Sequence, residues 1–176
     1  MYLVSLYFDD KSESKIQGLI NEVAEKSGNN FMIDNNVPPH ITIAAFQSDK
    51  EERVIQILDN VIKNNSKEGL ITFASIGSFK SSVIFLVPIL NEYLHNLSVN
   101  INEGISLIDD ISISKYYLPF QWIPHITIGK KLTKEELLLA FEELDKNFSI
   151  FNGKVTKIAL SKTNPLKDIA VWNLNN

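Results

Sequence analysis

The chain has 176 residues, a net charge of −4 and no cysteine. This length fits one compact domain or two small lobes that share a core. The absence of cysteine excludes a disulfide framework and a thiolate metal site, and the acidic balance argues against a surface that coats nucleic acid. No apolar run approaches the ~18–20 residues of a membrane span, and the N-terminus lacks the pattern of a signal peptide. We therefore expect a cytoplasmic monomer that does not associate with membranes.

The first elements alternate between strand and helix patterns. Residues 2–8 are rich in aromatic and β-branched side chains, which favours a buried strand. Apolar residues then recur with helical spacing over residues 16–23, and Gly28 marks the end of that helix. We expect a short strand at residues 31–33 and a longer one from His40 onward.

Capping patterns mark the helices that follow. Ser48 with Glu51, or Asp49 with Glu52, forms a capping box before an apolar stripe of helical spacing that runs to Ile62. The sequence therefore predicts a helix that begins close to residue 51.

The middle of the chain has the pattern of a hairpin and a helix. Residues 70–76 and 83–87 read as two strands joined around residues 77–82. Asn91 is a candidate cap for the next helix, which we expect Gly104 to close.

The last third begins with a capping box at Thr133–Glu136 and contains a turn signal at Asn152-Gly153. Two final strands are expected at residues 154–162 and 169–174. The complete order is β-α-β-α-β-β-α-β-α-β-β. It predicts an α+β fold in which residues 1–176 form a single domain of two pseudo-symmetric, ferredoxin-like lobes with antiparallel sheets around a central cleft.

One pentapeptide occurs twice. Residues 39–43 and 124–128 both read Pro-His-Ile-Thr-Ile and hold two of the three histidines of the chain. Because side chains alternate across a strand, the histidine and threonine of each copy share one face and the isoleucines share the other. Two such strands side by side would line a cleft with two imidazoles and two hydroxyls.

Such a cleft has the groups for phosphoryl chemistry. One of His40 and His125 can act as a base while the other acts as an acid at the same pH. Thr42 and Thr127 can donate hydrogen bonds to phosphoryl oxygens, where charge develops in the transition state. The scheme requires no metal or cofactor. The third histidine, His95, follows no motif and is interpreted as structural.

Other interpretations of the repeat exist. A duplication that kept only packing residues would explain the isoleucines but not the histidines and threonines on the opposite face. The cleft could also be a binding module that captures a nucleotide or an RNA end without turnover. A metal site is disfavoured, because no acidic residue or cysteine follows the usual ligand spacing.

These residues resemble the 2H phosphoesterase superfamily, which includes 2′-5′ RNA ligase-like proteins and cyclic nucleotide phosphodiesterases. The resemblance implies two similar α+β lobes around a cleft. It also implies metal-independent cleavage or formation of bonds at 2′,3′-cyclic phosphates and 2′-5′ linkages. By resemblance His40 and His125 are the catalytic pair, and Thr42 and Thr127 are the phosphate ligands. Gly77-Ser78-Phe79 is similar to the Gly-x-Phe hairpin of the family.

The residues after each motif depart from the family and bear on the substrate. Where the family often has a Phe-Leu-Gly-like continuation or an arginine, this chain has Ala44-Ala45-Phe46 and Gly129-Lys130-Lys131. The expected partner is a nucleotide or a short oligonucleotide with a phosphodiester bond.

Four further residues are candidates for substrate binding. Period-two alternation places Phe46 at the edge of the cleft, where its ring could stack on a base, although it could equally join the core. The same alternation places Lys131 near a phosphate, with an exposed strand end as the alternative. Tyr117 and Trp122 lie in an irregular aromatic segment, residues 105–124, that could form a loop over the cleft or belong to the core.

Overall fold

The computed structural model describes residues 1–64, 67–80, 82–163 and 165–175. Within these ranges it has five α-helices: α1 (Asp10–Ser27), α2 (Phe31–Asp34), α3 (Glu51–Lys63), α4 (Glu92–Ile105) and α5 (Lys134–Asn147). A 3-10 turn, η1, covers Lys115–Tyr117. The strands are β1 (Tyr2–Phe8), β2 (Ile41–Gln47), β3 (Gly69–Phe79), β4 (Val83–Pro88), β5 (Ser112–Ile113), β6 (Ile126–Lys130), β7 (Phe151–Lys162) and β8 (Lys167–Asn173).

All the named strands belong to one antiparallel sheet. Its order is β5-β2-β1-β7-β3-β4-β6, and β8 pairs with β7 beside this path. Strand β7 holds the sheet together, since it pairs with β1 along one edge and with both β3 and β8 along the other. The predicted α+β fold with antiparallel pairing is confirmed.

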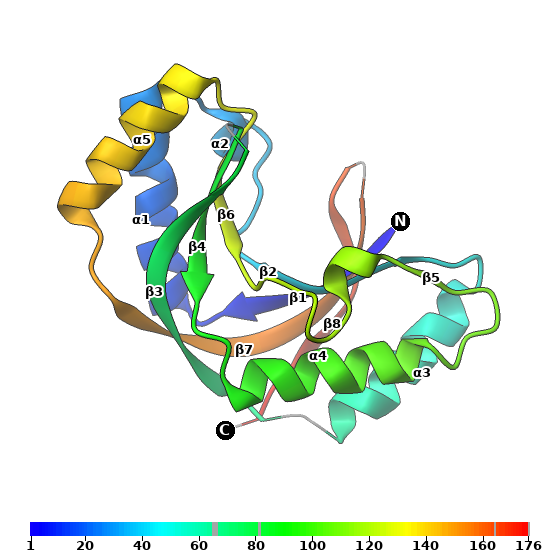
Figure 1. Ribbon diagram of the computed structural model, residues 1–176. Coiled ribbons are helices and arrows are strands. Elements are labelled where there is room, and N and C mark those ends of the chain that lie inside the picture. Colours follow the sequence, from blue (N-terminus) through cyan, green and yellow to red (C-terminus); the bar gives the residue numbers. More distant parts are fainter. Residues whose placement is uncertain (65–66, 81, 164, 176) are drawn as a thin grey trace.

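Two pairs of helices cover different ends of this sheet. Helices α1 and α5 pack together at one end, and α3 and α4 pack together at the other. The sheet bends strongly between these two pairs of helices (Figure 1). None of the helices in the described ranges is long and apolar enough to cross a membrane.

Strand β1 shows how the sequence pattern separates core from cleft. Its even-numbered side chains from Tyr2 to Phe8 are buried in the core. The odd-numbered side chains lie on the opposite face, as alternation along a strand requires, and Met1 and Leu3 line a cleft there.

Several helix ends form as the sequence predicts. The Asp9 carboxylate accepts a hydrogen bond from the Ser12 amide at 3.0 Å, and Gly28 ends α1 in the left-handed region at φ 74°. The Asn91 side chain accepts from the Leu94 amide at 3.0 Å. The capping box at the start of α5 is complete in both directions.

Two local predictions are wrong. Residues 31–33 belong to the short helix α2 and not to a strand. Helix α3 begins at Glu51 without a side-chain cap. The Ser48 hydroxyl donates instead to the Asp110 carboxylate at 3.2 Å, and the same carboxylate accepts a hydrogen bond from the backbone amide of Asp49 at 2.9 Å.

Two glycines serve close packing and not the ends predicted for them. Helix α4 continues past Gly104 to Ile105, and a Cβ on Gly104 would lie 2.6 Å from a methyl carbon of Val61 in α3. Gly153 lies within β7, where a Cβ would lie 2.8 Å from the Phe73 ring. Both glycines let a neighbouring side chain approach the backbone. Residues 152–153 belong to β7, so the turn predicted there is absent.

Two glycines, one within α1 and one directly after it, should respond oppositely to substitution by alanine. Gly18 has a helical backbone with no neighbouring atom within 4 Å of a Cβ, so we expect Gly18→Ala to stabilise the fold by roughly 0.5–1 kcal/mol. Gly28 has a φ of 74°, so Gly28→Ala should destabilise it by about 1–2 kcal/mol. Urea unfolding monitored by circular dichroism measures both changes, and equal effects of the two substitutions would contradict the description of this helix end.

Candidate active site

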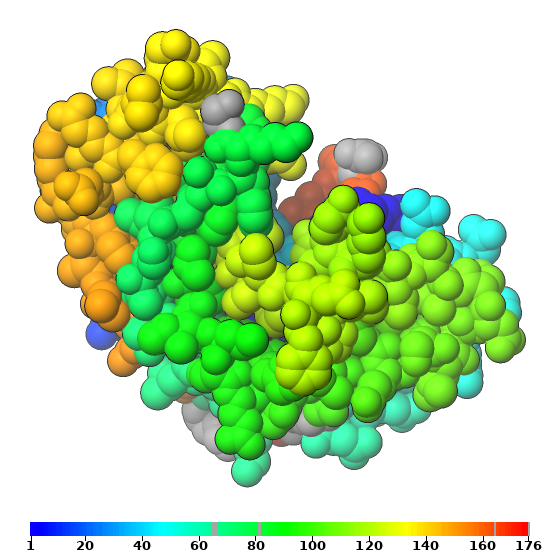
Figure 2. Space-filling view, viewed as in Figure 1, coloured from blue at the N-terminus to red at the C-terminus, as the bar shows by residue number. Residues whose placement is uncertain are grey.

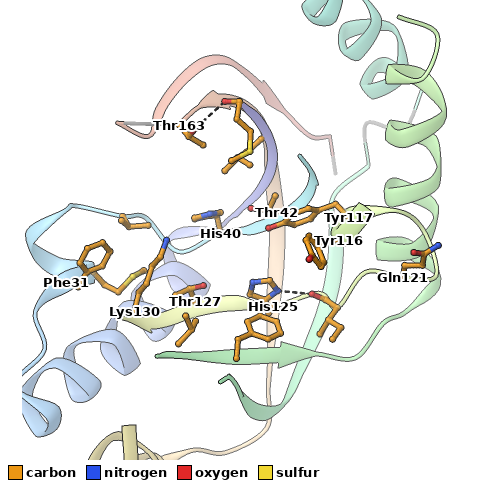
Figure 3. Close-up of a pocket in the computed structure, with 17 residues that line it drawn as sticks. Phe31, His40, Thr42, Tyr116, Tyr117, Gln121, His125, Thr127, Lys130 and Thr163 are labelled. Atoms are coloured by element: carbon orange, nitrogen blue, oxygen red, sulfur yellow. Dashed lines mark hydrogen bonds between the residues drawn. The ribbon is translucent and has the colours of Figure 1, made fainter. Parts of the chain in front are cut away.

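The two copies of the repeated pentapeptide meet in one cleft. His40, Thr42, His125 and Thr127 all line a cavity of about 660 Å³, a size typical of small-molecule sites. Figure 2 shows the molecule hollowed between the green β3–β4 hairpin and the segment around residues 115–117. Figure 3 shows the two histidines and two threonines around the middle of this cleft, at the start of β2 and of β6, which lie towards opposite ends of the sheet. The four side chains therefore share one cleft as expected, but the two motif strands are not adjacent in the sheet.

Each histidine is held by the same hydrogen bond. Nδ1 of His40 lies 2.7 Å from the carbonyl oxygen of Pro38, and Nδ1 of His125 lies 2.8 Å from that of Ile123. A carbonyl oxygen only accepts, so Nδ1 is the nitrogen that carries hydrogen in both rings. Nε2 of each neutral ring is then left with its lone pair, ready to accept a proton.

The bond depends on the proline of each repeat. A residue that precedes proline is confined to extended backbone, which fixes the carbonyl two positions before the histidine. Because Pro39 and Pro124 occupy equivalent positions, the two repeats form the same local structure.

Burial lowers the pKa of both histidines below the ordinary value of 6.5. For His40 the positive charge of His125 lowers the pKa further, while the hydrogen bond to Pro38 opposes the effect. For His125 the bond to Ile123 opposes burial in the same way. Both rings therefore favour the neutral form, and the two positive charges disfavour each other.

An extra residue in each motif strand explains two wrong predictions. In β2, Ala44 pairs with Val4 and Thr42 with Ser5, so Ile43 has no partner. In β6, Gly129 pairs with Ile84 and Thr127 with Phe85, leaving Ile128 without one. A bulge of this kind shifts the alternation of faces by one residue. Side chains after each threonine therefore change face.

The shift removes Phe46 from the cleft. Phe46 pairs with Tyr2, and their rings stack in the core with centroids 5.5 Å apart. Only 1% of Phe46 is exposed, so the expectation that it stacks on a base is wrong. Ala45 lies on the cleft face instead, opposite Leu3.

The same shift changes which of two neighbouring lysines lies on the cleft face. Lys130 pairs with Val83 on the cleft face and lines the cavity. Lys131 follows the strand at a φ of 59° and is not among the residues that line the cavity; its Nζ lies 4.6 Å from the centroid of the Phe31 ring. The cation at the cleft is Lys130, which strict period-two alternation misses.

The aromatic segment before β6 divides between cleft and core. Tyr117 lines the cavity, as does its neighbour Tyr116, which the sequence did not single out. Trp122 is 7% exposed and packs in the core, so its proposed stacking role is wrong. His95 lies on α4 against Phe120, with ring centroids 4.5 Å apart, and is not among the residues that line the cleft.

Two phenylalanines enclose His125. The ring centroids of Phe79 and Phe85 lie 5.0 Å and 5.2 Å from that of His125, and 4.2 Å from each other. Gly77 makes room for Phe85, because a Cβ there would lie 2.6 Å from Cε2 of the ring. The β3–β4 hairpin thus packs two aromatic rings against the second histidine.

The two ends of the cleft differ. Phe31 and Lys130 lie at one end, and Tyr116, Tyr117 and Gln121 lie at the other (Figure 3). Burial raises the pKa of Tyr117, which keeps its phenol neutral. In the described part of the chain, no group of three or more His, Cys, Asp or Glu side chains is placed to hold a metal ion.

The sequence matches the family model of the 2′-5′ RNA ligase superfamily over residues 10–165. The chain belongs to this superfamily. Among curated proteins, no sequence matches the chain.

Solved structures share the 2′-5′ RNA ligase fold with this chain. E. coli LigT in complex with 3′-AMP superposes with a TM-score of 0.65 at 15% identity, over 99% of this chain and 98% of LigT. A phosphoesterase superposes with a TM-score of 0.66 at 15% identity, over 99% and 98%. The complex of LigT with NADP+ gives a TM-score of 0.62 at 15% identity, over 99% and 97%. At these identities the likeness concerns the fold.

In this 2′-5′ RNA ligase superfamily member, the burial of His125 should depend on Gly77. In Gly77→Ala the added methyl group would overlap the Phe85 ring, and we expect a loss of about 1–3 kcal/mol in stability. Displacement of the ring lets water reach His125, so its pKa should rise toward 6.5.

An NMR titration of the histidine ring protons measures the change, with Gly18→Ala as the matched glycine control. An unchanged titration of His125 in a destabilised Gly77→Ala protein would show that the two phenylalanine rings do not bury it.

Proposed function

We propose that this chain is a metal-independent phosphoesterase of the paired-histidine type. The observation that carries the proposal is the meeting of both repeats in one cleft, each with its histidine held by Nδ1 and Nε2 left as the basic nitrogen. Its substrates would be 2′,3′-cyclic phosphates, 2′-5′ phosphodiesters or cyclic (oligo)nucleotides. Superfamily membership supports this substrate class, as do the complexes of LigT with 3′-AMP and NADP+.

The proposed reaction is an in-line displacement at phosphorus. Nε2 of one histidine removes a proton from water, and the water oxygen forms a bond to phosphorus. The bond from phosphorus to the leaving ribose oxygen breaks, and the other histidine gives that oxygen its proton. In the ligating direction the two histidines exchange these roles.

Hydroxyl groups and one cation would stabilise the transition state. Thr42 and Thr127 would donate to the non-bridging oxygens as negative charge builds on them. Lys130, which lines the same cavity, would add a positive charge. The three groups would orient phosphorus between the two imidazoles.

The rest of the substrate would extend toward both ends of the cleft. Tyr116 and Tyr117 lie at one end, where 70% of Tyr116 is exposed and open to stacking by a base. Phe31 lines the other end beside Lys130. These residues support a substrate with a nucleotide on either side of the phosphate.

Removal of either histidine should abolish most of the turnover. We expect His40→Gln and His125→Gln each to lower kcat at least ~10²-fold, because each loses a general acid or base. The assay presents 2′,3′-cyclic nucleotides, 2′-5′ and 3′-5′ dinucleotides and cyclic dinucleotides with EDTA present. Chromatography identifies the products.

His95→Gln is the matched control, since this third histidine lies away from the cleft, and it should retain full activity. Full activity of either cleft-histidine variant on the best substrate would refute the paired mechanism. Nucleotide that binds, stabilises the fold and is recovered unchanged would favour the binding module.

The pH profile should reflect the lowered pKa values of both histidines. A productive free enzyme needs one neutral and one protonated imidazole, and both rings lose their proton below 6.5. We therefore expect the maximum of kcat/KM below pH 6.5, with activity falling as pH rises past it. A bound phosphate anion stabilises imidazolium, so kcat should peak at a higher pH than kcat/KM. Steady-state kinetics over a pH series tests this, and a kcat/KM maximum well above pH 6.5 would contradict it.

A further inference from the structure

The two identical repeats lie in different surroundings. The His125 ring is enclosed by the phenylalanine rings of β3 and β4. The His40 ring instead meets the Tyr7 ring edge-on, with centroids 6.2 Å apart and an interplanar angle of 68°. Across the strands, Thr127 faces Phe85 whereas Thr42 faces the buried Ser5. One motif is therefore bordered by two phenylalanine rings, and the other by a tyrosine and a serine.

The phenol beside His40 is part of a hydrogen-bonded group. The Tyr7 hydroxyl donates to Oδ1 of Asp168 at 3.1 Å, and the Ser161 hydroxyl donates to the same oxygen at 2.6 Å. Tyr7 comes from β1, Ser161 from β7 and Asp168 from β8, which are neighbouring strands in register. Two donors on one carboxylate oxygen fix its position. The carboxylate is thus an ordered negative charge although Asp168 is exposed.

The charges that face His40 oppose one another. His125 and Lys130 both disfavour a positive charge on the His40 ring, and burial has the same sign and the larger effect. The negative charge of Asp168 acts in the opposite direction. Tyr7 adds no charge, because burial and the neighbouring Asp168 raise the pKa of its phenol. For His125 the principal influences are burial and its own hydrogen bond to Ile123.

We propose that Asp168, held in place by Tyr7 and Ser161, is a positioning residue for His40 and keeps this half-buried imidazole able to take up a proton. The effect of Asp168 on turnover rests on the proposed function, whereas its effect on proton uptake by the His40 ring does not. Asp168 lies in β8, far along the chain from the repeat that contains His40. Tyr7 has two roles in this arrangement, since its ring packs on His40 and its hydroxyl orients the carboxylate.

An NMR titration of the three histidines tests the proposal without any substrate. We expect Asp168→Asn to lower the proton affinity of His40 by about three- to tenfold, as loss of a nearby opposite charge does. His125 should change less, and His95 should not change. Tyr7→Phe leaves the carboxylate in place but loosens it, so it should shift His40 in the same direction by a smaller amount.

The opposite face of β1 supplies a matched control. Tyr2 donates to the Glu51 carboxylate at 3.0 Å, which repeats the tyrosine–carboxylate pair on the side away from the cleft. Tyr2→Phe and Glu51→Gln should leave the titration of His40 unchanged. Folding of every variant is verified from its amide NMR spectrum.

The outcomes separate this inference from the proposed function. A folded Asp168→Asn protein in which His40 titrates as in the wild type would overturn the positioning role, whatever the activity. Lower proton affinity of His40 in a protein that cleaves nothing would support the role and count against the enzyme. In an active protein, Asp168→Asn should also move one limb of the kcat/KM profile to lower pH, which the control variants should not do.

Discussion

The bond from each histidine Nδ1 to the carbonyl two residues earlier is the interaction on which the rest of the site depends. It determines which nitrogen of the ring is basic, and it ties the ring to backbone that the following proline makes rigid. The strand then needs only to present the threonine hydroxyl beside the ring. A short peptide with no cofactor thus specifies both the orientation and the tautomer of a candidate catalytic group, and the chain uses it twice.

The extra isoleucine in each motif strand explains the limit of sequence interpretation at this site. Alternation correctly placed Thr42 beside His40 and Thr127 beside His125, because the bulge comes after each threonine. Beyond the bulge, each side chain lies on the face opposite to the one that alternation predicts, so Phe46 lies in the core. No residue type marks the bulge, since isoleucine fits a regular strand equally well. The error therefore follows from register, a property of strand pairing that the local sequence does not encode.

Glycine shows the same division between local and tertiary causes. Gly28 ends α1 for a local reason, a left-handed backbone that the sequence pattern correctly indicates. Gly104 and Gly153 are required by side chains from other elements, Val61 and Phe73, that approach the backbone. Sequence spacing captured the order of the main elements and most of their caps, because those depend on neighbours along the chain. It could not capture contacts made by residues far apart in the sequence.

Two histidines from identical motifs need different surroundings if one is to act as the acid and the other as the base. Two imidazoles in equal surroundings would share one proton without preference, and half of the molecules would hold it on the wrong ring for a given direction of reaction. Here the difference comes from outside the repeats. The β3–β4 hairpin packs carbon against one ring, whereas β1, β7 and β8 bring a phenol and a carboxylate toward the other. Since hairpin and carboxylate lie on different strands, substitutions in either could tune one histidine while the paired pentapeptides stay unchanged.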